Sequence, residues 1–216
     1  MRSDVLETRL RAVLDSVESW DGSLAASRSD FDLNPTMRPP VERVLRPAAV
    51  LIPVVAREAG ATVLLTRRSD TMTSHTGQVA FPGGRLDPGE NAVEAALREA
   101  FEEVGLTADR IRPIGLSDTY ETGTGFRVTP VVAMVEPPFE LILNPDEVAE
   151  AFETPWEFLM DEANHRRESM VWQGAERFFW AMPWDDSGVE RYIWGVTAGM
   201  IRALHARLQS RAEDAA

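Results

Sequence analysis

The chain has no cysteine among its 216 residues. Disulfide bonds, thiolate zinc sites and a cysteine nucleophile are therefore excluded, and catalysis has to rely on oxygen and nitrogen groups. No apolar run approaches the roughly 20 residues of a membrane span, and the first residues, MRSDVLETRL, lack the apolar region of a signal peptide. We therefore expect a soluble, cytoplasmic protein without a membrane partner.

Positive charge is also scarce. The chain has 22 Lys and Arg residues against 35 Asp and Glu residues, which gives a formal net charge of -13. A nucleic-acid-binding surface needs clustered positive charge, so we expect no nucleic-acid partner. A phosphate-bearing substrate would need a metal ion and a few local arginines to offset the negative field.

The hydrophobic pattern predicts an N-terminal helical extension and linker in residues 1–40, one large domain in residues 41–209 and a polar tail in residues 210–216. The extension has apolar residues at helical spacing over residues 4–20, followed by residues of loop composition.

Within the domain, short β-rich runs alternate irregularly with helical patterns. Strands are predicted at residues 48–56, 61–68, 78–81, 111–116, 126–135 and 147–152, with a hairpin at residues 169–182. Helices are predicted at residues 91–104 and 189–208. Because the helices are few and do not strictly alternate with the strands, we expect an α/β fold with a mixed sheet. The small residues Gly195, Ala198 and Gly199 permit close helix packing, in the core or at the seam of a homodimer.

The segment ALREAFEEVG places Glu99, Glu102 and Glu103 on one face of a predicted helix. Like charges at these spacings destabilise a helix by about 0.2–0.5 kcal/mol per pair, so a cation is expected at this face. The simpler alternative is a solvated acidic surface. Arg98, four residues before Glu102, and Glu90, at the helix start, favour the cation.

Oxygen ligands without cysteine or histidine favour Mg²⁺ or Mn²⁺. Magnesium binds through a few carboxylates together with substrate phosphates, so the site predicts a phosphate-bearing substrate. Because the ligands must be ionised and the attacking water must lose a proton, activity should rise toward alkaline pH.

The segment GRLDPGENAVEAALREAFEEVGL, residues 84–106, resembles the signature of the Nudix hydrolases. Every fixed position of that signature matches: Gly84, Glu90, Arg98, Glu99, Glu102, Glu103 and Gly105. The resemblance implies a Nudix domain in residues 41–209, folded as an α/β/α sandwich in which this segment forms a loop-helix-loop. It also implies hydrolysis of a nucleoside diphosphate linked to another group.

By the same resemblance, the metal ligands are Glu99, Glu102 and Glu103, and Arg98 orients the carboxylates through Glu102 or Glu90. The base that activates water is either Glu103 or Glu147, a residue of the NPDEV loop. An inactive ligand-sensing or scaffold protein is disfavoured because the carboxylate set and Arg98 are intact. The isoprenoid diphosphate isomerases that share the fold are disfavoured because they need a cysteine.

The preceding stretch LLTRRSDTMTSHTGQVAFPGGRLD, residues 64–87, resembles the longer motif of the coenzyme A pyrophosphatases. This implies cleavage of coenzyme A or acyl-coenzyme A to 3′,5′-ADP and (acyl) 4′-phosphopantetheine. The substrate-binding residues would be Arg68, His75, Gly83 and Gly84. Thr73 stands where members of that group usually carry an arginine, which could remove a phosphate donor. ADP-ribose, a dinucleotide or a nucleoside triphosphate therefore stays open as the substrate.

Overall fold

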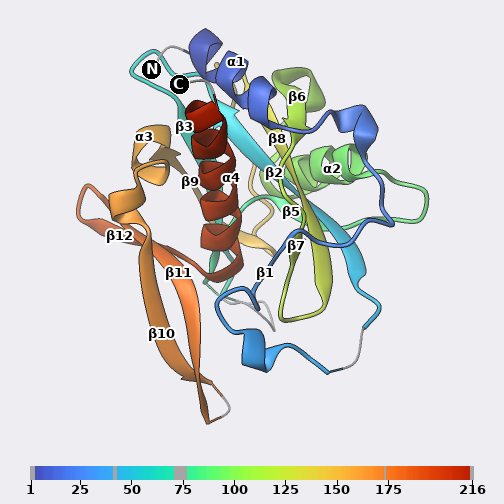
Figure 1. Cartoon of the computed structure of the whole chain (residues 1–216). Helices are drawn as coiled ribbons and strands as arrows, with labels where there is room; N and C mark the ends of the chain where they lie inside the picture. Colours follow the sequence, from blue (N-terminus) through green and yellow to red (C-terminus); the bar gives the residue numbers. More distant parts are fainter. Residues whose placement is uncertain (1–2, 41–42, 71–76, 173, 215–216) are drawn as a thin grey trace.

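The computed structural model describes residues 3–40, 43–70, 77–172 and 174–214 (Figure 1). The α-helices in these residues are α1 (Ser3–Val13), α2 (Ala92–Val104), α3 (Trp156–Leu159) and α4 (Gly195–Asp214). Short 3-10 helices are η1 (Val17–Ser19), η2 (Pro35–Met37), η3 (Ala108–Arg110) and η4 (Glu162–Asn164). None of the helices in this part of the chain combines the length and apolar content of a membrane-spanning segment.

The described strands form two sheets. The larger, nine-stranded sheet consists of β1 (Arg28–Ser29), β2 (Arg46–Val55), β3 (Thr62–Arg68), β4 (Val79–Ala80), β5 (Gly83–Arg85), β6 (Ile111–Leu116), β7 (Tyr120–Glu121), β8 (Phe126–Val135) and β9 (Val148–Pro155). Its order is β1-β7-β8-β2-β3-β4, while β5, β6 and β9 pair with β2, β8 and β3. β2 pairs with β8 in parallel and with β3 antiparallel, so the sheet is mixed, as predicted.

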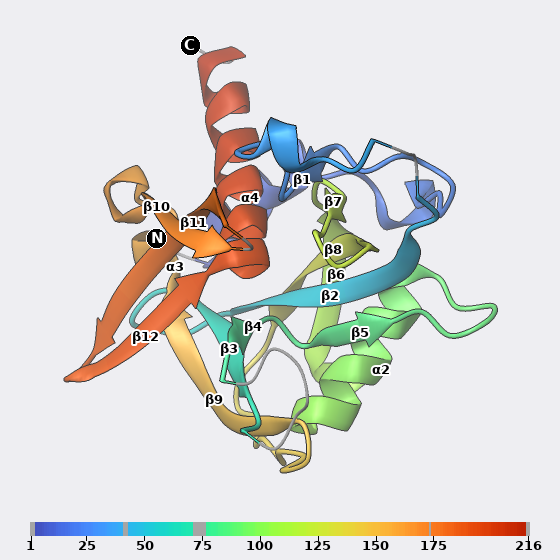
Figure 2. The same ribbon diagram turned by 90° about the horizontal axis from the view of Figure 1, so that it is seen from below.

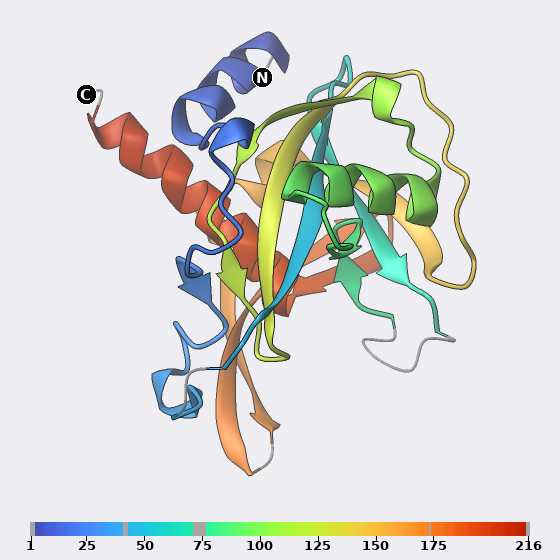
Figure 3. The same cartoon turned by 90° about the vertical axis from the view of Figure 1, so that its right-hand side faces the viewer.

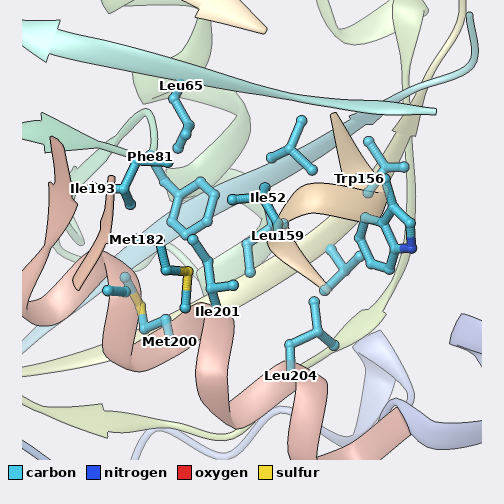
Figure 4. Close-up of a cluster of buried hydrophobic side chains, with 14 of the residues drawn as sticks. Ile52, Leu65, Phe81, Trp156, Leu159, Met182, Ile193, Met200, Ile201 and Leu204 are labelled. Carbon is cyan, nitrogen blue, oxygen red and sulfur yellow. The ribbon is translucent and has the colours of Figure 1, made fainter. Parts of the chain in front are cut away.

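The larger sheet is covered by helices on both faces, which gives the predicted α/β/α sandwich. Figures 2 and 3 show α2 on one face and α4 on the other. Successive side chains of a strand point to opposite faces, so apolar residues at consecutive positions of β2 supply both cores. Leu51 and Val55 pack with the alanines of α2, whereas Ile52 and Val54 pack with α4. Figure 4 shows the α4-side core, which includes Ile52 of β2 and Ile201 and Leu204 of α4.

The predicted helix at residues 91–104 is confirmed as α2, and its ends follow from local chemistry. Asn91 and Glu94 form a capping box at the start. Gly105 ends the helix in the left-handed conformation, with φ of 69°. A Cβ at this glycine would also lie 2.9 Å from Cβ of Ile142, so a side chain has no room. The caps therefore fix the register of the carboxylate-bearing turns.

The prediction of one helix over residues 189–208 is wrong at its start. Val189–Trp194 is a strand, β12, and α4 begins only at Gly195. β12 pairs with β11 (Ala175–Asp186), which pairs in turn with β10 (Arg166–Trp172) to complete the smaller sheet. The predicted hairpin at residues 169–182 is thus present but longer. The helical pattern concealed a local hairpin, in which Ser187 and Gly188, both with positive φ, turn the chain from β11 directly into β12.

The N-terminal residues share the α4-side core. The predicted helix over residues 4–20 ends at Val13, and its Leu6 and Leu10 are fully buried. Residues 21–40 were predicted to be a linker, but β1 within them pairs in parallel with β7. This stretch is therefore held against the large sheet instead of crossing free solvent.

Candidate active site

Arg98 lies among the carboxylates of α2. Its guanidinium donates two hydrogen bonds to Glu90, at 2.8 and 3.1 Å, and one each to Glu99 (2.9 Å) and Glu102 (3.0 Å). A further bond of 3.0 Å reaches the backbone carbonyl of Arg85. The hydrogen bond with Glu90 is the main cause that raises the pKa of Arg98 above its ordinary value. This single cation thus holds three carboxylates in defined directions.

Glu103 lies on the inner side of α2 and is only 3% exposed. Burial raises its pKa to about 8, the neighbouring Glu99 and Glu147 carboxylates add to the rise, and Arg68 opposes it. The backbone N–H of Gly83, which faces the Glu103 carboxylate, also opposes the rise of this pKa. A buried carboxylate with negative neighbours is stable when it is protonated or when a cation joins it. The position therefore favours a bound cation.

Glu147 comes from the loop that follows β8, far from α2 in the sequence. The loop is fastened to the end of α2, because the backbone N–H of Asn144 donates to the carbonyl of Glu103 at 2.9 Å. The side-chain amide of Asn144 then donates to Glu147 at 3.2 Å. From the other side, the backbone N–H of Ser69 donates to the Glu147 carbonyl at 2.8 Å. These bonds place Glu147 near Glu103 and Arg68.

Two glycines of β5 form the boundary between these carboxylates and the opposite face of the sheet. A Cβ at Gly84 would lie 2.6 Å from Cδ of Glu99, and a Cβ at Gly83 would lie 2.6 Å from Cα of Val50. Any side chain at either position would displace its neighbours, because real Cβ atoms do not approach so closely. β5 and α2 lie side by side in Figure 2. The glycines thus let the strand approach the carboxylates.

A cleft of about 1060 Å³ opens on the α4 side of the large sheet. It meets the carboxylate site at Arg68, Gly83 and Gly84, all of which line the cleft. Gly84 lies against the Glu99 carboxylate, while Arg68 and Gly83 lower the pKa of Glu103. Its aromatic lining residues are Phe81, Tyr120, Phe126, Trp172, Phe178, Phe179, Trp180 and Trp194. Ligand pockets commonly have 300–1,000 Å³, so a large substrate with an apolar portion fits this cleft.

The residues that line one side of the cleft come from the N-terminal segment and were missed by sequence reasoning. Asp30 accepts hydrogen bonds from the Tyr120 hydroxyl (3.1 Å), the Gly123 backbone N–H (2.7 Å) and Arg177 (3.0 Å). Asn34 exchanges two 2.8 Å bonds with the backbone of Phe178. The segment thereby joins the β7–β8 region to the β10–β11 hairpin. No local sequence signal indicates these contacts, because their partners lie far along the chain.

The structure brings some of the predicted site residues together and leaves others apart. Glu99, Glu103, Glu147 and Arg68 come together, and Gly83 and Gly84 adjoin them. Glu102 lies on the outer side of α2 beside Arg98, with 51% of its side chain exposed. His75, and Thr73 with it, lies outside the described residues.

The donor set fits a hard divalent cation, because every side-chain ligand it offers is a carboxylate. Burial also raises the pKa of Glu99, and Arg98 opposes this shift. Within residues 3–40, 43–70, 77–172 and 174–214, no three metal-ligating side chains are already arranged as a cage. A small hard cation does not need one, since it keeps several waters and shares ligands with substrate phosphates.

Comparison with known proteins gives a family match over the same region. The NUDIX domain model matches residues 45–173. The uncharacterized Nudix hydrolase NudL of Citrobacter koseri is 39% identical over 77% of this chain and 84% of its own. Its counterpart of Yersinia enterocolitica is 41% identical over 73% and 78%.

Solved structures give weaker similarities. A Caenorhabditis elegans Ap4A hydrolase complex is 24% identical, covers 51% of this chain and 80% of its own, and has a TM-score of 0.46. A MutT/nudix family protein from Enterococcus faecalis is 13% identical, covers 99% and 75%, and has a TM-score of 0.48. Because both TM-scores are below 0.5, the assignment depends on the family model and the sequence relatives.

Proposed function

This chain belongs to the Nudix hydrolase family, an assignment that makes it an enzyme acting on pyrophosphate bonds, and from this premise we propose that it cleaves the diphosphate of coenzyme A or acyl-coenzyme A. The products would be 3′,5′-ADP and (acyl) 4′-phosphopantetheine. The observation that carries the proposal is the junction at Gly83, Gly84 and Arg68, where a large aromatic cleft meets the carboxylates of α2. A diphosphate at this junction would leave both of its substituents room along the cleft.

We assign the metal ligands to Glu99, Glu102 and Glu103, and the metal to Mg²⁺ or Mn²⁺. When bound, the ion would withdraw charge from the diphosphate and make a water molecule more acidic. Arg98 would orient the carboxylates, a role that its bonds to Glu90, Glu99 and Glu102 support. Glu102 would have to turn from Arg98 toward the ion, which its exposed position permits.

The residues around the junction have separate parts in this proposal. Arg68, whose charge acts on Glu103, would hold a phosphate oxygen, and the backbone at Gly83 and Gly84 would allow the diphosphate to approach closely. Glu103 and Glu147 are the two carboxylates proposed to take the proton from water. A pH profile of Glu147→Gln separates them: loss of one ionisation together with a large fall in kcat assigns the base to Glu147.

A second substrate class is favoured by one observation in the sequence. Thr73 replaces the arginine usual in the coenzyme A pyrophosphatases, so the 3′-phosphate could lack its ordinary partner. The alternative is hydrolysis of ADP-ribose or a dinucleotide at the same site. It predicts equal or better cleavage of substrates without a 3′-phosphate.

The experiment is product analysis after incubation of the purified protein with Mg²⁺ or Mn²⁺. Coenzyme A, dephospho-coenzyme A and ADP-ribose are compared in parallel. Preferential release of 3′,5′-ADP from coenzyme A supports the proposal, and better cleavage of ADP-ribose refutes it in favour of the alternative. Glu102→Gln should abolish turnover without loss of the fold, while Glu58→Gln, at an exposed carboxylate far along the chain, is the matched control.

A further inference from the structure

Two arginines flank one aromatic ring in the cleft. The guanidinium carbon of Arg46 lies 4.0 Å from the centroid of the Phe126 ring, and that of Arg85 lies 5.5 Å from it. Arg46 donates one hydrogen bond, of 3.0 Å, to the carbonyl of Thr124. Neither arginine forms an ion pair with a carboxylate of the described residues. Each guanidinium has five N–H donors, and the described residues accept only one hydrogen bond from the Arg46 side chain.

The strand pairing directs both arginines into the cleft. Ala48 of β2 pairs with Arg85 of β5, and Arg46 of β2 pairs with Phe126 of β8. Residues paired directly across strands share a face, and Ala48 belongs to the α4-side core. The side chains of Arg46, Arg85 and Phe126 therefore lie on the cleft side of the sheet, and all three residues line the cleft.

The pair is close to the junction with the carboxylate site. Arg85 follows Gly84 directly, and its backbone carbonyl accepts the hydrogen bond from Arg98. Val50 pairs with Gly83, and Arg46 is four residues before Val50 along β2, a distance of about 13 Å in an extended strand. A ligand group beside Arg46 and Arg85 would thus lie within about 13 Å of a diphosphate at Gly83 and Gly84.

The charges around the pair favour an anion. The arginines that line the cleft are Arg28, Arg46, Arg68, Arg85, Arg177 and Arg202. Of these, Arg28, Arg177 and Arg202 form ion pairs with Asp118, Asp30 and Glu162. The acidic lining residues are Asp30 and Asp32. Asp30 is engaged by Arg177, and Asp32 accepts from the backbone N–H of Ser29 at 3.0 Å. In a chain with a net charge of -13, this wall is a local positive region.

We propose that Arg46 and Arg85, held by Phe126, form a second anion site that binds a phosphate monoester of the substrate, separate from the diphosphate that is cleaved. The inference rests on the proposed function, because a substrate with both groups is needed to use both sites. Planar guanidinium groups bind phosphate through paired N–H donors, and stacking on an aromatic ring restricts their motion. This site would select coenzyme A over dephospho-coenzyme A, although Thr73 is not an arginine.

The test compares two substrates that differ only in the 3′-phosphate. The ratio of kcat/KM for coenzyme A to kcat/KM for dephospho-coenzyme A is measured for the full chain, Arg46→Ala, Arg85→Ala and the double variant. We expect the ratio to fall roughly tenfold with each substitution, since each removes charge-assisted hydrogen bonds. Arg110→Ala, at an exposed arginine paired with Asp109, is the control and should keep the ratio of the parent.

An unchanged ratio in the double variant, or an equal fall in Arg110→Ala, overturns the inference. Direct binding separates this result from a failure of the proposed hydrolysis. Adenosine 3′,5′-bisphosphate and AMP are titrated into the protein by calorimetry, a measurement that needs no turnover. Tighter binding of the bisphosphate, lost in the double variant, supports the anion site even if coenzyme A is not cleaved, and equal binding of both nucleotides refutes the site even if it is cleaved.

Discussion

Replacement of the buried Glu103 should stabilise the protein in the absence of metal. Burial raises the pKa of this carboxyl from 4.5 to about 8. Between pH 4.5 and about pH 8, Glu103 keeps its proton in the folded state and loses it in the unfolded state. The free energy of unfolding therefore falls as the pH rises through this range. Glu103→Gln removes the ionisation while keeping nearly the same side-chain volume, so the variant should escape this loss.

The magnitude follows from the same two pKa values. One unit corresponds to 1.36 kcal/mol, so the gain in unfolding free energy from Glu103→Gln should be about 1 kcal/mol at pH 5.5 and on the order of 4 kcal/mol at pH 8. The exposed Glu102 supplies the matched control. Glu102→Gln should change the stability by less than about 1 kcal/mol, because an exposed ion pair contributes little.

The assay is urea denaturation in excess EDTA at several pH values between 5 and 8.5, with each variant compared with the parent at the same pH. Differences between variants cancel the contributions of other titrating groups. Addition of Mg²⁺ should reverse the order at pH 8, because the parent then gains a bound cation that the variant binds less well. A gain that does not depend on pH, or a loss of stability at pH 8 in EDTA, would refute the reasoning.

Three further predictions concern the residues around the carboxylates and the cleft. Gly84→Ala places a Cβ 2.6 Å from Cδ of Glu99, so kcat should fall roughly 100-fold, measured in parallel with a circular-dichroism check that the fold is retained. Arg98→Lys cannot reproduce the paired bonds to Glu90, so metal-dependent activity should fall about 10- to 100-fold, and activity within twofold of the parent would contradict an orienting role. Asp30→Ala leaves Arg177 without its carboxylate partner, so the unfolding free energy should fall by roughly 3 kcal/mol and KM should rise, as measured by denaturation and steady-state kinetics.

The features that the sequence by itself determined are local. The ends of α2 follow from Asn91, Glu94 and Gly105, which interact with backbone groups within a few residues. The helical period alone puts Glu99, Glu102 and Glu103 on nearby turns, and the absence of cysteine leaves oxygen ligands for the cation. The prediction of the helix is confirmed because it involves neighbours in the sequence, and the cation stays a prediction.

The tertiary structure decided the features that depend on distant partners. It brings Glu147 beside Glu103 through Asn144, and it places Gly84 against Glu99. The strand at residues 189–194 is by contrast local, because the two-residue turn at Ser187 and Gly188 folds it back onto β11. One wall of the cleft depends on the contacts of Asp30 and Asn34 with Arg177 and Phe178, which lie more than a hundred residues further along the chain. No local propensity specifies such contacts.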